Sequence, residues 1–245
     1  RKRLRERLAS PYVTASPASV LDELSGLFAF DLTAEQKRVF FEIASDMSAK
    51  KPMMRLLQGD VGSGKTIVAL GAALFGAAAG FQTALMAPTE VLAEQHYGYF
   101  KSILGTRLKI RKITGRTDIS GKAYVISEFK RGAADVIIGT HALLNPALEF
   151  AKLGLVIIDE QHRFGVFQRA KLPEKGNMPN VLIMTATPIP RTLAHTVYGD
   201  LDMSVISERL PHQKPIKTAV SSIKKLAEVY ESMRRRLDDG GRIYY

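Results

Sequence analysis

One eight-residue stretch constrains this chain more than any other, because it combines three glycines with a lysine and a threonine. It reads Gly59-Asp60-Val61-Gly62-Ser63-Gly64-Lys65-Thr66 and fits the pattern G-x-x-x-x-G-K-[ST]. A largely apolar run at residues 53–57 reads as a short buried strand, and residues 67–75 follow as an apolar helix. The glycines allow successive backbone N–H groups to turn around an anion, at the positive end of the helix dipole. The stretch therefore predicts a phosphate-binding loop.

The last two side chains of this loop have the chemistry that a nucleotide requires. Lys65 adds a point charge for the β- and γ-phosphates, and the Thr66 hydroxyl is the expected ligand for Mg²⁺. A turn that binds nothing is the alternative. The strand and helix on either side favour phosphate binding, because that chemistry requires both.

Apolar runs of strand length alternate with helical patterns from residue 53 onward, which predicts an α/β fold with a parallel sheet and helices on both faces. Strands are expected near residues 55–58, 83–87, 109–113, 135–138, 155–158, 181–184 and 203–206. Helices are expected near residues 65–79, 91–104, 122–132, 168–172 and 191–198.

The remaining stretches divide the chain into three parts. Residues 1–27 read as a basic helix and linker, and residues 28–210 as the nucleotide-binding domain, with Thr33 as the N-cap of a helix to about residue 49. Pro211 and Pro215 flank a polar hinge. Residues 211–245 then restart a β-α-β pattern, with strands at 216–220 and 242–245 around a helix at 223–237. We expect these to open an incomplete second domain of the same kind.

Two adjacent carboxylates follow the predicted strand at residues 155–158. In an open α/β sheet the carboxyl ends of the strands bind ligands, and the phosphate loop lies at the same edge. We expect Asp159 to hold Mg²⁺, and Glu160 to orient and deprotonate the water that attacks the γ-phosphorus. An acidic pair after a strand is otherwise often a helix cap. Beside this pair, His162 is a candidate sensor of the γ-phosphate.

Charge and composition narrow the class of partner. The chain has 35 Lys and Arg against 24 Asp and Glu, a formal net charge of +11 and a pI near 9.8. This excess favours a polyanion such as DNA or RNA, although a solvated basic surface is the alternative. The sequence contains no cysteine, which excludes disulfides and suits a reducing cytoplasm. It also has no apolar run of the roughly 20 residues that a membrane span needs.

Three motifs together resemble the motors of superfamily-two helicases, and within them the RecG family of bacterial branched-DNA helicases. They are the phosphate loop at residues 59–66, Asp159-Glu160-Gln161-His162 and Thr185-Ala186-Thr187-Pro188-Ile189-Pro190-Arg191-Thr192. The resemblance implies a P-loop NTPase fold of the RecA-like type, ATP and Mg²⁺ as cofactors, and branched double-stranded DNA as the partner. The activity implied is that of an ATP-dependent helicase or translocase in DNA repair and recombination.

The resemblance also assigns residues that recognise the adenine base and residues that couple the nucleotide state to domain movement. Leu32-Thr33-Ala34-Glu35-Gln36 resembles the glutamine motif of the family, in which Gln36 reads the adenine edge. Phe30 packs on the adenine ring in this reading, with a core role as the alternative. Thr185, Thr187 and Arg191 couple the nucleotide state to domain movement, although two threonines at a strand end also fit a helix cap.

Three strand-end segments would contact the DNA backbone if the resemblance holds. They are Pro88 with Thr89, Thr114-Gly115-Arg116, and Gly139-Thr140-His141. Thr89 and the backbone N–H groups beside it open a helix, where a phosphate binds well. Each segment in isolation also fits an ordinary turn or cap.

Competing functions remain open at this point. A translocase of the Mfd family, which couples transcription to repair, is the nearest alternative. Ser63, Gln161 and residues 198–202 favour RecG. A nucleotide-gated DNA-binding module without unwinding is a second alternative. The second motor lobe with its arginine finger, and the DNA-gripping wedge domain, are expected to lie outside this chain. We therefore expect the chain alone to hydrolyse ATP weakly.

Overall fold

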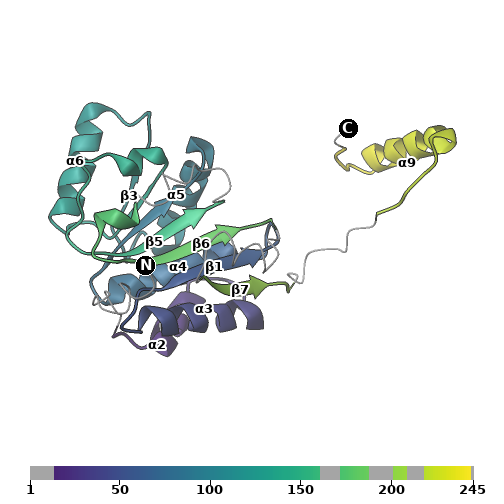
Figure 1. The fold of residues 1–245 in the computed structure, drawn as a ribbon. Helices are drawn as coiled ribbons and strands as arrows, with labels where there is room; N and C mark the ends of the chain where they lie inside the picture. Colours follow the sequence, from purple (N-terminus) through teal and green to yellow (C-terminus); the bar gives the residue numbers. More distant parts are fainter. Residues whose placement is uncertain (1–13, 161–171, 188–200, 209–217, 244–245) are drawn as a thin grey trace. The chain divides into compact units, whose positions relative to one another are not determined.

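The structure is a computed structural model that describes residues 14–160, 172–187, 201–208 and 218–243 (Figure 1). The chain divides into two compact units, Arg1–Leu210 and Pro211–Tyr245. The first unit contains a β-sheet with helices packed on it. The described part of the second unit contains a 3₁₀ turn, η4, at Ile223–Lys225 and the helix α9 at Leu226–Asp238.

The sheet of the first unit is parallel throughout, and its order is β3-β4-β2-β5-β6-β1-β7. Its strands are β1 (Met54–Gly59), β2 (Gln82–Met86), β3 (Ile110–Ile113), β4 (Val136–Gly139), β5 (Leu153–Asp159), β6 (Asn180–Thr185) and β7 (Asp202–Ile206). Each lies within about two residues of a strand expected from the sequence. The predicted α/β fold with a parallel sheet is therefore confirmed.

Helices cover both faces of this sheet, as the sequence predicts. They are α2 (Pro17–Ser25), α3 (Ala34–Met47), α4 (Lys65–Ala78), α5 (Glu90–Leu104) and α6 (Ile119–Lys130). Because successive strand residues point to opposite faces, Leu57 joins one core with α2, α3, α4 and α5. Its neighbour Leu56 joins a second core with Val125 and Phe129 of α6.

Helix α4 is buried along most of its length, between the sheet and the pair α2 and α3. A Cβ atom on Gly71 of α4 would lie 2.8 Å from Cδ2 of Leu24 and 2.8 Å from Cδ2 of Phe40. Glycine at this position therefore permits the close packing of α2 and α3 on α4. The expected boundary after residue 27 is consequently wrong for residues 17–25, because α2 is part of the first unit and buries Val20 and Leu24.

The second unit differs from the sequence expectation in its strands. The helix expected at residues 223–237 is present as η4 and α9. Residues 218–220 and 242–243, which fall in the two expected strands, have no regular structure. A strand is stabilised by pairing with a neighbouring strand, and the described residues of this unit offer none. The helices expected at 168–172 and 191–198 fall outside the described residues apart from Leu172, which lies in a turn.

No helix in the described part of the chain is both long and apolar enough to cross a membrane.

Candidate functional site

The parallel order of the strands brings the predicted site residues to one edge of the sheet. The phosphate loop follows β1, the acidic pair ends β5, and Thr185 ends β6. These three strands are neighbours in the order β5-β6-β1. The three segments expected to contact DNA follow β3, β4 and β2, which are the adjoining strands. The carboxyl edge therefore has two halves, one with the phosphate loop and one with the candidate DNA segments.

The phosphate loop takes a conformation that depends on its glycines. Gly62 and Gly64 have φ angles of 80° and 89°, in the left-handed region that L-residues rarely adopt. Gly64 caps the N-terminus of α4, and its carbonyl oxygen accepts from the N–H of Ile67 over 2.9 Å. The N-terminal N–H groups of this buried helix are thereby directed toward the loop, which is the arrangement that binds an anion.

The side chain of Lys65 folds back on the phosphate loop, where its ammonium group donates hydrogen bonds to backbone carbonyl oxygens. Its Nζ donates to the carbonyl oxygens of Gly59 over 2.5 Å and Asp60 over 2.9 Å. Burial lowers the pKa of Lys65 below its ordinary value, while the charges of Glu160 and Asp159 oppose this shift. The lysine is thus a partly desolvated cation that faces two carboxylates, which suits the binding of a polyphosphate.

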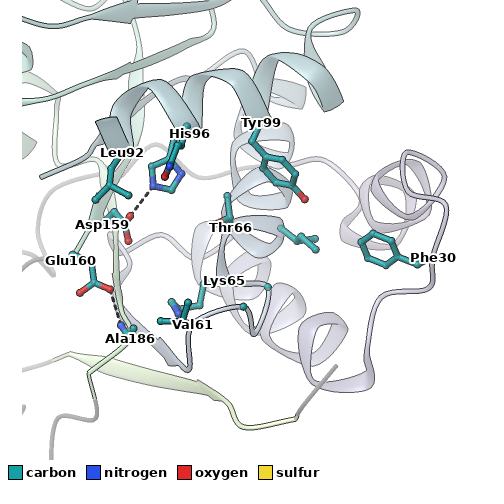
Figure 2. Close-up of a pocket in the computed structure, with 14 residues that line it drawn as sticks. Phe30, Val61, Lys65, Thr66, Leu92, His96, Tyr99, Asp159, Glu160 and Ala186 are labelled. Atoms are coloured by element: carbon teal, nitrogen blue, oxygen red, sulfur yellow. Dashed lines mark hydrogen bonds and ion pairs between the residues drawn. The ribbon is translucent and has the colours of Figure 1, made fainter. Parts of the chain in front are cut away.

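Both carboxylates after β5 have defined partners. Oδ2 of Asp159 lies 2.7 Å from Nε2 of His96, a residue of α5 (Figure 2). Oε1 of Glu160 accepts a hydrogen bond from the backbone N–H of Ala186 over 3.0 Å. The backbone of Glu160 has a φ of 48°, which is unusual for a residue other than glycine. Such a conformation persists where the surroundings fix it, and Glu160 lies beside the phosphate loop in the same cavity.

The two threonines after β6 contact each other. Their hydroxyl oxygens lie 2.9 Å apart, and the backbone N–H of Thr187 donates to Oγ1 of Thr185 over 3.2 Å. Between them, Ala186 reaches Glu160 as described above. The segment expected to couple nucleotide state to movement is thus in direct contact with the acidic motif through Ala186. The expected coupling residues His162 and Arg191 lie outside the described residues.

A cavity of about 610 Å³ lies at this edge of the sheet (Figure 2). Its walls come from the phosphate loop, the start of α4, one face of α5 and the ends of β5 and β6. The lining residues are Phe30, Val61, Gly62, Gly64, Lys65, Thr66, Ile67, Leu92, Gln95, His96, Tyr99, Asp159, Glu160 and Ala186. The phosphate loop, both carboxylates and Phe30, the aromatic side chain expected to pack on adenine, therefore line one cavity. Phe30 is 52% exposed, in keeping with a side chain that faces a ligand and not the core.

Gln36, which is expected to read the adenine edge, is not among the residues that line this cavity. The side chain is 1% exposed, and its Nε2 donates to the carbonyl oxygen of Ser63 over 3.1 Å. Its Oε1 accepts from the N–H of Thr33 over 3.0 Å, completing a capping box at the start of α3. Both ends of the amide are therefore engaged, and Gln36 braces the phosphate loop from behind.

Thr66 and Asp159 form a donor set that fits Mg²⁺. Both line the cavity beside the phosphate loop, and hydroxyl and carboxylate oxygens are the ligands this ion prefers. No group of three or more His, Cys, Asp or Glu side chains in the described part of the chain is arranged to hold a metal. Mg²⁺ commonly binds through one or two protein oxygens, substrate phosphates and water, so this sparse set is sufficient.

The expected DNA residues line up along the other half of the edge, with unequal exposure. Thr89 is exposed and caps α5, and its hydroxyl oxygen accepts from the N–H of Leu92 over 3.2 Å. The Arg116 side chain is 90% exposed and pairs with Glu90 over 3.0 Å. Thr140 is instead buried, and its Oγ1 has no hydrogen-bond partner among the described residues.

The other residues of the three candidate DNA segments differ in exposure, and one of them must be glycine for steric reasons. A Cβ on Gly139 would lie 2.2 Å from the carbonyl oxygen of Ile113, so only glycine fits between β3 and the end of β4. Gly115 and His141 are exposed, Pro88 is partly exposed, and Thr114 is buried. Exposed backbone at strand ends is suited to gripping a phosphate backbone without reading bases.

Sequence reasoning missed the contribution of α5 to the cavity. His96 projects from this helix toward Asp159, and Tyr99 also lines the cavity (Figure 2). Ala93, His96 and Phe100 share the buried face of α5 at helical spacing. A histidine within an otherwise apolar stripe was the available signal, but its partner Asp159 lies 63 residues away. The resemblance assigned a coupling role to Thr185 and Thr187, but it did not indicate that the backbone N–H of Ala186 between them donates to Glu160.

A comparison with known families decides the class of protein. The sequence pattern of the family described as DEAD/DEAH box helicase matches residues 33–196, which is most of the chain and contains the loop, the acidic pair and the threonine motif. The chain belongs to this helicase family.

Relatives of this helicase chain include proteins named ATP-dependent DNA helicase RecG. The protein of Synechocystis sp. is 49% identical over 92% of this chain and 27% of its own length. The protein of Streptococcus pneumoniae is 49% identical over 88% of this chain and 32% of its own length. That of Thermotoga maritima is 45% identical over 99% of this chain and 30% of its own length. The helicase chain thus spans about a third of these relatives.

Solved structures agree with this likeness. A structure of RecG bound to a three-way DNA junction is 42% identical, has a TM-score of 0.85, and covers 98% of this helicase chain and 32% of that chain. The helicase MrfA bound to DNA is 19% identical over 94% of this chain and 36% of that one, with a TM-score of 0.64, and shares the fold. The RecA-like architecture expected from the sequence is therefore confirmed.

Proposed function

We propose that this chain is the first motor lobe of an ATP-dependent DNA helicase or translocase that acts on branched DNA in repair and recombination. The observation that carries the proposal is the contact between Glu160 and Ala186, because it joins the expected catalytic carboxylate to the expected coupling segment. The likeness to RecG proteins and to RecG on a three-way junction supports branched DNA as the substrate. The absence of cysteine supports a cytoplasmic setting.

The phosphate loop supplies the binding energy for the triphosphate in this mechanism. Backbone N–H groups at the start of α4 and the Lys65 ammonium hold the β- and γ-phosphates. Thr66 and Asp159 would hold Mg²⁺, which supplies charge neutralisation on the phosphates when it is bound. Phe30 offers an aromatic face at the far side of the same cavity, where the base would pack (Figure 2).

Glu160 is the residue placed to activate water. Its Oε1 is bound to the Ala186 N–H, while the carboxylate lines the cavity that contains Lys65 and Thr66. As general base, it takes a proton from the water that attacks the γ-phosphorus, and the Lys65 ammonium stabilises charge on the transferred group. When the γ-phosphate leaves, the electrostatic interaction between the phosphate and the Glu160 carboxylate is lost. The hydrogen bond from Ala186 to Glu160 then transmits this change to the segment after β6.

The DNA half of the edge would grip phosphates and not bases. Thr89, Arg116 and the backbone near Gly139 follow β2, β3 and β4, which adjoin the nucleotide half. Contacts of this kind position a duplex without reading its sequence, as a translocating motor requires. The formal charge of +11 supports a polyanionic partner.

The chain is proposed to need partner domains for full activity. RecG relatives are about three times as long as the part that this chain spans. A second motor lobe would contribute an arginine finger, and such a residue contributes about 10³–10⁵ to phosphoryl-transfer rates. A wedge domain would grip the DNA branch. We therefore expect this chain to bind Mg-ATP and to hydrolyse it poorly.

The decisive experiment compares ATP binding and turnover by this chain with those of a longer form that includes the second lobe. Both are measured with and without forked DNA, beside the Lys65→Ala variants. Binding by the chain, with DNA-stimulated turnover only in the longer form, is the expected result. Strong turnover by the chain alone would contradict the proposal that a catalytic arginine comes from elsewhere. Turnover in the longer form without strand separation or movement on forked DNA would favour a nucleotide-gated binding module.

A further inference from the structure

His96 is buried at the point where helix α5 meets the acidic pair. The residue is 8% exposed, and the side chains of His96 and Asp159 are 10% and 12% exposed. Nε2 of His96 lies 2.7 Å from Oδ2 of Asp159 (Figure 2). This is a short contact between two side chains that the fold has removed from most solvent, so it has a strong influence on how each is oriented.

The chemistry of the two groups fixes the direction of the hydrogen bond. An ionised carboxylate only accepts hydrogen bonds, so Nε2 of the histidine carries the proton and donates it. The bond engages Oδ2 and restricts rotation of the carboxylate. Oδ1 is then the oxygen left for a ligand in the cavity, where Thr66 supplies the second protein oxygen. Hydrogen-bond partners of this kind orient carboxylates toward metals.

The position of His96 on α5 adds a second consequence. Thr89 caps the same helix, and the first helical residue, Glu90, pairs with Arg116 over 3.0 Å. Thr89 and Arg116 belong to two of the segments proposed to contact DNA. Two turns further along, His96 contacts Asp159. One rigid helix therefore connects the DNA half of the edge to the nucleotide half.

We propose that His96 is a positioning residue that orients Asp159 toward Mg²⁺ and connects this carboxylate to the DNA-contacting end of α5. The inference rests on the proposed function and deepens it, because it assigns a residue that links the two halves of the site. His96 acts through Asp159 and touches neither the reacting phosphorus nor the attacking water.

The test measures nucleotide binding by this chain, so that catalysis is not needed. A fluorescent ATP analogue is titrated in EDTA and then at increasing Mg²⁺ concentrations. The variants are His96→Ala, which removes the donor, and His96→Gln, which retains an N–H donor at similar reach. Ser102→Ala is the matched control, because Ser102 is exposed on the same helix and its hydroxyl donates to the carbonyl oxygen of Tyr99.

We expect His96→Ala to raise the half-saturating Mg²⁺ concentration by about 10- to 100-fold, with analogue affinity in EDTA unchanged. His96→Gln restores part of this loss, and Ser102→Ala behaves as the unmodified chain does. An unchanged Mg²⁺ requirement in His96→Ala would overturn the inference. Equal losses with and without Mg²⁺, which His96→Gln does not restore, would also overturn it, because they indicate a general change in the cavity.

A second readout tests the connection through α5. Forked DNA and Mg-ATP are expected to change each other's affinity for the unmodified chain by the same factor. His96→Ala brings this factor toward one, while His96→Gln retains it. An undiminished factor in His96→Ala would overturn the connecting role. Failure of the unmodified chain to bind the analogue in a Mg²⁺-dependent manner would overturn the proposed function and this inference with it.

Discussion

The backbone N–H of Ala186 donates to Oε1 of Glu160 over 3.0 Å, and this bond connects the end of β6 to the end of β5. The N–H of Glu160 in turn donates to the carbonyl oxygen of Met184 over 3.0 Å. These two bonds hold Glu160 in its left-handed conformation, with a φ of 48°. For a residue other than glycine such a conformation costs about 1–3 kcal/mol, which the surrounding contacts offset.

Glu160→Gln separates binding from catalysis. The amide keeps an oxygen that accepts from Ala186, so the local geometry and ATP affinity are retained. Because the amide is not a base, ATP turnover by the longer form with its second lobe falls by at least about 10²-fold. Steady-state ATPase assays with forked DNA measure this loss. Glu174→Gln, at an exposed carboxylate outside the cavity, is the control. Turnover within a factor of two of the unmodified enzyme would exclude Glu160 as the base.

Lys65→Ala removes the cation of the phosphate loop. Nζ of Lys65 is held by the carbonyl oxygens of Gly59 and Asp60, close to where the phosphates would lie. We expect affinity for ATP to fall by at least about tenfold, because a charge-assisted bond to phosphate is lost, about 1.5–3 kcal/mol. Isothermal titration calorimetry measures this change. Lys37→Ala, at an exposed lysine of α3, should leave affinity unchanged. Equal affinities for both variants would place the triphosphate elsewhere.

Local sequence patterns predicted the strands and the phosphate loop because both follow from neighbouring residues. Periodicity located all seven described strands, and the spacing of glycines located the loop between β1 and α4 in which Gly62 and Gly64 have positive φ angles. Contacts between distant residues could not be predicted in this way. The amide of Gln36, expected at the adenine, donates to Ser63, 27 residues away. His96 was overlooked, because its partner Asp159 is visible only once α5 is placed on the sheet.

Gln36 variants test whether this side chain braces the loop or reads the base. Gln36→Ala removes the bond to Ser63 and part of the capping box, so the free energy of unfolding falls by about 1–2 kcal/mol. Gln36→Glu keeps the acceptor for Thr33 but loses the donor to Ser63. Both variants should weaken ATP and GTP binding by the same factor. A selective loss for ATP in competition titrations would show that Gln36 reads adenine.

Arg55 is 9% exposed and forms a partly buried network that connects β1 to α3 and β7. Its Nε donates to Oδ2 of Asp46 over 2.8 Å, and a second nitrogen donates to the hydroxyl of Ser204 over 2.7 Å. Arg55→Ala leaves Asp46, whose side chain is 26% exposed, without this partner, and we expect the free energy of unfolding to fall by about 1.5–3 kcal/mol. Denaturant unfolding measures this. Arg107→Ala breaks a more exposed pair with Glu23 and should cost less than about 1 kcal/mol. Similar losses for both variants would contradict the burial argument.

The ion pair between Glu128 and Arg111 makes the stability of the fold depend on pH in the acid range. Hydrogen bonds from the Arg111 guanidinium, with a smaller contribution from the Tyr124 hydroxyl, hold the pKa of Glu128 below its ordinary value. The carboxylate therefore stabilises the fold at neutral pH, where both states are ionised. This stability is lost as the pH falls through the lowered pKa of the folded state, below the ordinary Glu value of about 4.3.

Glu128→Gln should lower the free energy of unfolding at pH 7 by about 2 kcal/mol, because Arg111 loses its charged partner. It should also flatten the fall in stability below about pH 4, since one carboxylate no longer takes up a proton on unfolding. Chemical denaturation from pH 3 to 7 measures both effects. Glu94→Gln, at an exposed carboxylate paired with Lys112, should leave the pH profile nearly unchanged. A Glu128→Gln profile parallel to that of the unmodified chain would mean that other carboxylates determine its acid sensitivity.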